Sequence, residues 1–305
     1  MSKGRADSAA AKADPVTRFF TALDEPGHLA IFEGHSATLR LDVLDGKKVE
    51  RWHVSITRGD VAVTHSATPA DATVAMSQWA SLRQAHLDLG HDVRTIEPVA
   101  GLPDMVFAAN GALVVDGTVL GVRFRYPQRA AEADAYLQWF RDRGYEDVRE
   151  PSHVNEGEGD ILFTGQALLA GHGFRSDKAA ADELAAVFGL PVVSLRLVDP
   201  RFYHLDTALC VLDSDTAMYY PAAFDDASRA ALAAHFAELI EAKDEDAEVL
   251  GLNAVSDGRH VVLPQQATGL AAQLAAAGFE PVGVDLSEFL KAGGGPKCCT
   301  LEIRP

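Results

Sequence analysis

The stretch DILFTGQALLAGHGFRSDKAAADELAAVFGLPVVSLRLV, residues 160–198, contains two apolar strands, a helix and a third strand in direct succession. Residues 160–165 and 167–174 are short apolar runs of strand length. Residues 178–190 have the length and the composition of a helix, and residues 191–198 form a third apolar run. This succession predicts one strand-strand-helix-strand unit of an α/β fold.

The same rhythm continues on both sides of this stretch. No glycine fingerprint for a dinucleotide and no low-complexity linker interrupts it, so we predict one α/β domain of similar units over residues 76–305. The expected helices are 76–93, 129–145, 228–243 and 266–279, and the expected apolar strands include 96–99, 105–110, 111–124 with a turn at Asp116-Gly117, 207–213, 281–286 and 298–303.

The chain before residue 76 has a different pattern. Residues 36–66 alternate apolar and polar side chains, with turn signals at Asp45-Gly46 and at 58–60, which predicts a β-meander. With a short helix expected within 14–32, residues 15–75 form a small α+β unit of uncertain role. The strand pattern of residues 39–56 weakly resembles part of a sterol-carrier-like domain.

Composition limits the class of protein and its partners. Residues 1–14 are polar and alanine-rich without the apolar run of a secretory signal, so we expect a flexible tail and a cytoplasmic protein. The net charge is −17, which argues against a nucleic-acid partner, and no apolar stretch is long enough to cross a membrane. Three cysteines make no disulfide framework. We expect no metal and no cofactor, and a homo-oligomer is possible.

The segment GGGPKCC, residues 293–299, offers a candidate nucleophile. Three glycines allow backbone geometry that side chains forbid, and they precede the thiol of Cys298. Lys297 is expected to favour the thiolate of Cys298. The alternative is that Cys298 and Cys299 are buried small apolar residues, as free cysteines usually are.

A histidine near a predicted strand offers the matching acid and base. His204 lies at the start of an apolar strand, and Asp206, two residues later, is expected on the same side, where it can orient the imidazole. A thiol with an oriented histidine is a nucleophile with its proton-transfer partner. The alternative is a structural histidine, since the chain has 11 of them.

The segment NEGEGD, residues 155–160, places three acidic side chains between glycines. Glu156, Glu158 and Asp160 can hold a guanidinium cation through charge-assisted hydrogen bonds. The alternatives are an acidic surface turn, or a metal site with oxygen ligands alone, because no histidine or cysteine follows at ligand spacing.

Six segments in this order resemble the dimethylargininase and arginine deiminase or dihydrolase superfamily, the guanidine-modifying enzymes. They are PDMVFAAN up to Asn110, YPQR up to Arg129, EGEGD from Glu156, GFRSD around Arg175, HLDT from His204, and GGGPKC up to Cys298. The resemblance implies the pentein-like fold of that superfamily, a pseudo-fivefold propeller of ββαβ units around a substrate channel. It also implies an enzyme that needs no cofactor and acts on a small arginine-type substrate.

The resemblance implies a role for each matching residue. Cys298 is the nucleophile, His204 the general acid and base, and Glu156 the carboxylate that holds the guanidinium, with Glu158 as its rival because the acidic motif has one extra residue. The implied substrate-binding residues are Asp104 and Asn110 at the guanidinium, Arg129 and Arg175 at the α-carboxylate, the Ala292 carbonyl, and the acidic Asp160 and Asp206.

One departure from the superfamily concerns the first blade. The Cys-Pro-Pro and Asn-Pro-Trp-Met segments of relatives are missing, and residues 15–75 look unrelated to them. Either the N-terminal unit replaces that blade or the channel is damaged. The leading expectation is hydrolysis of methylated arginine to citrulline and an alkylamine. The alternatives are arginine deiminase or dihydrolase activity, amidine transfer, and an inactive relative that acts as a binding or scaffold protein.

Overall fold

The computed structural model describes residues 36–45, 48–58, 60–66, 72–75 and 77–304. The chain divides into two compact units, Met1–Ser81 and Leu82–Pro305. This division falls within helix α3 (Ser77–Asp88), close to the change of pattern that the sequence shows near residue 75. The tail and the helix expected before residue 33 lie outside the described residues.

The first unit contains one mixed sheet with the strand order β3-β2-β1-β4. Its strands are β1 (Ser36–Asp45), β2 (Lys48–Thr57), β3 (Asp60–His65) and β4 (Ala72–Ala75). β1, β2 and β3 pair antiparallel in sequence order, so the predicted meander is confirmed, and β4 joins β1 in parallel. Val54 and Ile56, two residues apart on one face of β2, are buried together with Val61.

The second unit repeats one ββαβ pattern four times. In each repeat two strands pair antiparallel, a helix follows, and a third strand pairs in parallel with the second. The repeats are β5 (Leu113–Val115), β6 (Thr118–Leu120), α4 (Glu132–Asp142), β7 (Asp147–Arg149); β8 (Ile161–Phe163), β9 (Leu168–His172), α5 (Ala180–Phe188), β10 (Val192–Arg196); β11 (Leu209–Val211), β12 (Thr216–Tyr219), α6 (Asp226–His235), β13 (Glu238–Glu241); and β14 (Val255–Ser256), β15 (His260–Pro264), α8 (Thr268–Ala276), β16 (Glu280–Val284).

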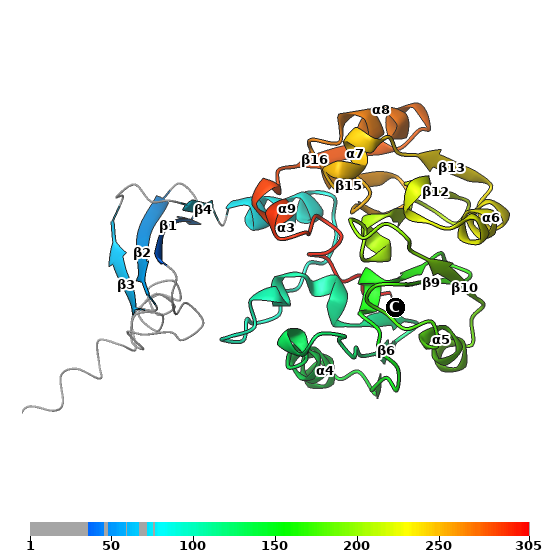
Figure 1. Cartoon of the computed structure of the whole chain (residues 1–305), viewed down its shortest axis with the longest axis horizontal. Helices are drawn as coiled ribbons and strands as arrows, with labels where there is room; N and C mark the ends of the chain where they lie inside the picture. Colours follow the sequence, from blue (N-terminus) through cyan, green and yellow to red (C-terminus); the bar gives the residue numbers. More distant parts are fainter. Residues whose placement is uncertain (1–35, 46–47, 59, 67–71, 76, 305) are drawn as a thin grey trace, which may run out of the picture. The chain divides into compact units, whose positions relative to one another are not determined.

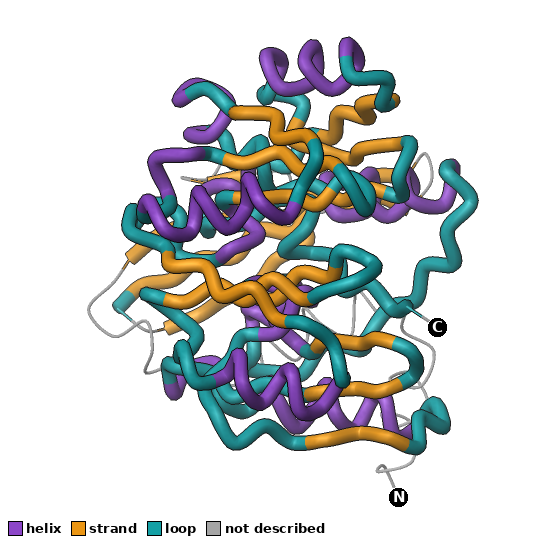
Figure 2. The backbone as a smooth tube through the Cα atoms, turned by 90° about the vertical axis from the view of Figure 1, so that its right-hand side faces the viewer, coloured by secondary structure: helices purple, strands orange, loops and turns teal. Residues whose placement is uncertain are grey.

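The helices of these repeats lie at the periphery of the second unit. Figure 1 shows α4, α5, α6 and α8 on its outer side, with the strands nearer its centre. Figure 2 shows strands, helices and loops alternating along the tube. An α/β fold of repeated units is therefore confirmed.

The remaining elements are short and lie in loops within the repeats, between them, or before the first and after the last repeat. They are the helices α7 (Asp244–Glu248) and α9 (Ser287–Lys291) and the 3₁₀ helices η2 (Pro103–Val106), η3 (Ala108–Gly111), η4 (Pro127–Arg129), η5 (Gly157–Gly159), η6 (Leu205–Thr207) and η7 (Pro221–Ala223). η3, η5 and η6 each come just before the first strand of a repeat.

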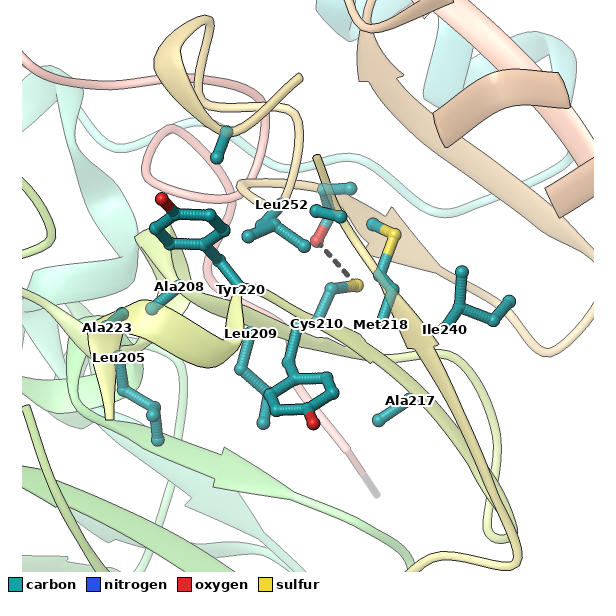
Figure 3. Packing of buried hydrophobic residues seen from close by; sticks show 14 of the residues in the cluster. Leu205, Ala208, Leu209, Cys210, Ala217, Met218, Tyr220, Ala223, Ile240 and Leu252 are labelled. Carbon is teal, nitrogen blue, oxygen red and sulfur yellow. Dashed lines mark hydrogen bonds between the residues drawn. The ribbon is translucent and has the colours of Figure 1, made fainter. Parts of the chain in front are cut away.

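The largest core joins three repeats. It packs side chains of β11, β12 and β13 against η6 and the turn at Leu252 (Figure 3). Cys210 belongs to this core, where its Sγ donates to the carbonyl of Ala254 at 3.3 Å, and burial raises its pKa to about 12. This cysteine is therefore a packing residue.

Four predictions of secondary structure were wrong. Residues 96–99, expected as a strand, form no strand. Residues 105–110, expected as a strand, form η2 and η3, because backbone groups there bond to the Cys298 segment instead of a neighbouring strand. The helix expected over 228–243 ends at His235, since Phe236 turns to an extended conformation and β13 pairs with β12. Residues 298–303 form no strand, although Ile303 makes one parallel bridge with Val114.

Candidate active site

Five turns of the second unit are joined by hydrogen bonds into a closed circuit. Four of them precede the first strand of a repeat, and the fifth carries Cys298. The links are Glu158 N to Ala112 O (3.3 Å), Leu205 N to Asp160 Oδ1 (3.0 Å), Asn253 Nδ2 to Asp206 O (3.1 Å), Cys298 N to Asn253 Oδ1 (3.0 Å), and Ala109 N to Cys298 O (3.0 Å). We refer to this set of turns as the turn circuit.

A pocket with a volume of about 90 Å³ opens beside the turn circuit. Most of the side chains that line it are polar or charged, and seven are residues that the sequence predicted. The lining consists of Asp104, Phe107, Asn110, Arg129, Arg175, Tyr203, His204, Ala292, Gly293 and Cys298.

Glu156 and His204 form a buried ion pair at this pocket. His204 Nε2 lies 2.7 Å from Glu156 Oε2, and both side chains are almost fully buried. Burial opposes the charge of Glu156, but the hydrogen bond and charge of His204 and the charge of Arg175 outweigh it and lower the pKa of Glu156 to about 2. Burial also opposes the charge of His204, yet its bond to Glu156 and the nearby carboxylates raise its pKa. The pair is therefore an imidazolium held by a carboxylate.

Glu156, and not Asp206, orients the imidazole. The sequence placed Asp206 beside His204 on a strand, but His204 is extended and precedes the 3₁₀ helix η6, so the alternation of a strand does not apply. Asp206 Oδ2 instead lies 3.3 Å from Cys298 Sγ. Within the described part of the chain, Asp206 Oδ1 is buried without a hydrogen-bond partner. Asp206 thus contacts the thiol through Oδ2, and its other carboxylate oxygen, Oδ1, is an unsatisfied acceptor.

Asp160 does not reach the pocket. Its Oδ2 accepts from Ser176 N at 3.1 Å and from Ser176 Oγ at 2.6 Å, and its Oδ1 accepts from Leu205 N. Both oxygens are used inside the protein, so Asp160 is a positioning residue for the turn that carries His204. Its predicted contact with substrate has no support in this geometry.

Glu158, the rival of Glu156, belongs to a buried ion network on another side of the Cys298 turn. Lys297 Nζ lies 2.7 Å from Glu158 Oε2 and 2.6 Å from Glu302 Oε1, and Arg304 pairs with both carboxylates. The ammonium of Lys297 is therefore held by carboxylates, and the expectation that it favours the Cys298 thiolate stays a prediction. The network holds the Cys298 turn in place.

Removal of one carboxylate from this network should lower stability by an amount that depends on pH. Burial opposes the charge of Glu302, but the charges of Lys297 and Arg304 outweigh it and lower its pKa to about 2. A carboxylate with a lowered pKa stabilises the fold at pH values above its unfolded-state pKa of about 4.3. This stabilisation is lost as the pH falls towards 2. Glu302→Gln should therefore lower the free energy of unfolding by about 2 kcal/mol at neutral pH.

Urea unfolding of the two proteins at several pH values measures this difference. It should stay constant above about pH 4.5 and shrink as the pH is lowered further. An equal difference at neutral pH and near pH 3 would show that the charge of Glu302 is not what stabilises the fold.

Two arginines reach the pocket already paired. Arg175 Nη1 lies 3.1 Å from Glu156 Oε2, and its guanidinium packs over the rings of Tyr126 and Tyr203. Arg129 forms bidentate hydrogen bonds with Glu132 and donates from Nη1 to Asn110 Oδ1 at 2.8 Å. The partner Glu132 lies on α4 three residues after Arg129, and the sequence reasoning missed it.

The glycines of residues 293–295 place the nucleophile turn. Gly293 has a φ of +81°, which side chains disfavour, and its carbonyl accepts from the Tyr203 hydroxyl at 3.0 Å. A Cβ on Gly295 would lie 2.8 Å from Asn253 Oδ1. Cys298 lines the pocket, whereas Cys299 packs in an apolar cluster with Leu82 and Val262. The structure thus separates the two cysteines.

Asn253 contacts the nucleophile and was missed from the sequence. It is fully buried, its Nδ2 lies 3.1 Å from Cys298 Sγ, and its Oδ1 accepts from Cys298 N. The only signal that could have identified it is its place before the first strand of the fourth repeat, the same place that Asn110 and His204 take in other repeats.

In the described residues, no group of three or more His, Cys, Asp or Glu side chains is arranged to hold a metal ion. None of the helices in the described ranges has the length and apolarity to cross a membrane.

Relatives with known names share most of the chain. A dimethylarginine dimethylaminohydrolase of Mycobacterium tuberculosis is 59% identical over 237 residues, which are 78% of this chain and 78% of that protein. A bifunctional arginine dihydrolase/ornithine cyclodeaminase of Synechocystis is 38% identical over 234 residues, 75% of this chain and 33% of that longer protein.

Solved structures give the same picture. The N-terminal domain of the Synechocystis arginine dihydrolase ArgZ, bound to substrate, superposes with a TM-score of 0.72 at 37% identity and covers 75% of this chain and 86% of that one. A dimethylarginine dimethylaminohydrolase adduct matches the fold with a TM-score of 0.64 at 22% identity, over 74% of this chain and 89% of that one. The family model described as N,N dimethylarginine dimethylhydrolase, eukaryotic, matches residues 63–305, and the chain therefore belongs to that family.

Proposed function

We propose that this protein is a dimethylargininase, which hydrolyses free methylated arginine to citrulline and an alkylamine. The observation that carries the proposal is one pocket in which Cys298 and His204 face the same space while Glu156 holds His204. The high identity with the mycobacterial dimethylarginine dimethylaminohydrolase supports the same substrate class.

In the first half-reaction the substrate carbon becomes bonded to sulfur. The Cys298 thiol passes its proton to Asp206 Oδ2, at 3.3 Å, and its Sγ adds to the guanidinium carbon. The imidazolium of His204 gives a proton to the departing nitrogen as the C–N bond breaks, and dimethylamine leaves. A covalent thiouronium on Cys298 remains.

In the second half-reaction water replaces sulfur. The neutral His204 takes a proton from a water molecule as its oxygen adds to the thiouronium carbon. The C–S bond then breaks and the electron pair returns to Cys298 Sγ, which takes back the proton from Asp206. The hydroxyl group of the intermediate loses its proton to solvent, and the ureido group of citrulline remains. Glu156 stabilises each imidazolium state of His204 through the 2.7 Å contact.

Binding of a cation should make the thiol easier to ionise. Burial and the nearby Asp206 raise the pKa of Cys298 well above its ordinary value. A guanidinium in the pocket brings positive charge next to the sulfur, which favours the thiolate by Coulomb attraction. Arg129 and Arg175 are proposed to hold the α-carboxylate of the substrate, and Arg175 must then leave Glu156. Asp104, Asn110 and the Ala292 carbonyl are proposed contacts of the remaining substrate atoms.

Hydrolysis of unmethylated arginine is the second candidate. Asp206 Oδ1 is buried without a partner in the described residues, and such an oxygen favours N–H donors that a dimethylated nitrogen lacks. The ArgZ domain, an arginine dihydrolase, has the same fold at 37% identity. Amidine transfer would use the same covalent intermediate with an amine in place of water.

Product analysis by mass spectrometry tests the proposal. The protein is incubated separately with asymmetric dimethylarginine and with arginine, and protein alkylated with iodoacetamide serves as the blank. Citrulline and dimethylamine from the first substrate support the dimethylargininase. Citrulline or ornithine with ammonia from arginine alone supports the second candidate, and no product from either supports an inactive relative.

The pH dependence of turnover should have an acid limb near pH 6. Burial chiefly raises the pKa of Asp206, to about 6, against the opposing effects of His204 and Cys298. Below that pH Asp206 is protonated and cannot accept the thiol proton, so kcat/KM should fall about tenfold per pH unit. Glu156, with its pKa of about 2, remains ionised throughout. A profile measured in a folded protein that stays flat down to about pH 4.5 would contradict this role of Asp206.

We also infer that the turn circuit completes a pseudo-fivefold arrangement. Four ββαβ repeats supply four of its turns, and the Cys298 turn supplies the fifth. The bridge between Ile303 and Val114 supports this view, because it joins the end of the fifth segment to the first repeat. A complete circuit supports an intact channel despite the atypical N-terminal unit. A homo-oligomeric state and a cytoplasmic location remain predictions, as does the role of residues 15–75.

A further inference from the structure

Asn253 makes more contacts with the nucleophile turn than any assigned role requires. Its Nδ2 donates to Cys298 Sγ at 3.1 Å and to the Asp206 carbonyl at 3.1 Å, while its Oδ1 accepts from Cys298 N at 3.0 Å. Its own backbone carbonyl accepts from Lys297 N at 3.3 Å. The side chain is fully buried, so these bonds face no competition from water.

The partners of Asn253 fix which end of its amide faces the sulfur. The Cys298 N–H is a donor and needs the oxygen, and the Asp206 carbonyl is an acceptor and needs the nitrogen. In a flipped amide, the NH2 group would face the Cys298 N–H, which is also a donor. The amide oxygen would then face the Asp206 carbonyl, which is also an acceptor. The N–H group of Asn253 therefore points at Sγ.

The charges around the sulfur show why such a donor matters. Asp206 Oδ2 lies 3.3 Å from Sγ, and the ammonium of Lys297 is bound to Glu158 and Glu302. The backbone of Gly295 lowers the pKa of Cys298, although burial and Asp206 raise it overall. The neutral N–H group of Asn253 is therefore the donor that directly contacts the sulfur, at 3.1 Å.

We propose that Asn253 is a catalytic residue: its amide N–H, 3.1 Å from Sγ, stabilises the Cys298 thiolate as an oxyanion hole stabilises an alkoxide. A hydrogen bond from a fixed donor strengthens when its acceptor becomes charged, and therefore favours the ionised state. Gly295 is a glycine because a Cβ there would collide with Asn253 Oδ1, at 2.8 Å. The inference concerns the nucleophile of the proposed hydrolase, yet it can be tested without any turnover.

Alkylation by iodoacetamide reports the thiolate directly. All proteins carry Cys299→Ala, so the tryptic peptide of residues 298–305 contains one sulfur, and its alkylation is followed by mass spectrometry over a range of pH. Asn253→Ser and Asn253→Asp should react about 10- to 100-fold more slowly at a fixed pH below the pKa of the thiol, because the thiolate loses a charge-assisted bond. Asn253→Asp should be the slower, since it adds a negative charge.

The Asp variant also separates catalysis from a structural role. It keeps the acceptor for the Cys298 N–H and nearly the shape of asparagine, so the turn can retain its conformation. The proposal would be overturned if either Asn253 variant, with the melting temperature of the parent protein, were alkylated at Cys298 at the parental rate or faster. Failure of the proposed hydrolase activity would leave the alkylation rates readable, so the two failures are distinguishable.

A measurement on the unaltered side chain covers the case in which the variants unfold. The chain has three asparagines, Asn110, Asn155 and Asn253, so labelling with ¹⁵N-asparagine gives three side-chain amide signals. The Asn253 signal should move with pH together with the alkylation rate of Cys298, and the Asn155 signal should not. An Asn253 signal that does not respond to ionisation of the thiol would contradict the proposal.

Discussion

Cys298→Ala should lower kcat/KM for dimethylarginine by about 10⁴-fold or more, because no other group in the pocket can form the covalent intermediate. The sulfur lines the pocket and contacts Asp206 and Asn253, whereas the other lining groups are bound in ion pairs or are not nucleophilic. The rate of citrulline formation is measured with enzyme in excess, so that slow turnover remains visible. Substrate binding should persist, since alanine leaves the charged groups in place.

Cys299→Ala is the matched control for this change. Its sulfur packs in an apolar cluster and does not line the pocket, so it does not face the substrate. The control should retain kcat within a factor of about three. Equal losses of activity in the two variants would mean that the turn collapses on substitution. A loss of activity in Cys299→Ala alone would show that Cys299, and not Cys298, is the nucleophile.

His204→Gln should lower kcat by about 10³-fold with a small change in KM. Glutamine can keep a hydrogen bond to Glu156 but cannot transfer a proton to the departing amine. Without an acid the amine must leave unprotonated, and without a base the thiouronium waits for unassisted attack by water. Intact-protein mass spectrometry should therefore reveal a trapped adduct on Cys298 when the first step still proceeds.

His235→Gln is the control for the histidine change. His235 is partly buried and bonds Thr164 Oγ1 at 3.2 Å, away from the residues that line the pocket. His235→Gln should leave kcat unchanged, and it shows how the loss of a partly buried imidazole affects the stability of the fold. Retention of more than a tenth of kcat by His204→Gln would show that another group transfers the proton.

The repeated fold could be predicted because its signals are local. Residues 160–198 contain a complete unit in which apolar runs of strand length flank a helix, and the structure has β8, β9, α5 and β10 there. Residues 105–110 are equally apolar but form 3₁₀ turns, since their partners lie in the Cys298 segment nearly two hundred residues later. An apolar run alone carries no information about such a distant partner.

The site could be predicted in part for the same reason. Ordered motifs indicated Cys298, His204 and Arg175, and these residues meet in the pocket. Spacing failed for Asp206, because it lies within a 3₁₀ turn, where the direction of a side chain follows neither strand nor helix periodicity. Asn253 lies in no recognised motif, and only the circuit of turns shows that its amide meets the sulfur.

The turn circuit has a consequence for how the enzyme acquires its activity during folding. Its closing bond joins Ala109 to Cys298, so it brings together two segments at the greatest sequence separation within the circuit. Contacts of high sequence separation form late, because the chain must first lose the entropy of a long loop. Each repeat can assemble from neighbouring residues, whereas the pocket exists only after this last contact. The amide of Ala109 should accordingly gain protection from hydrogen exchange in step with the first appearance of activity during refolding.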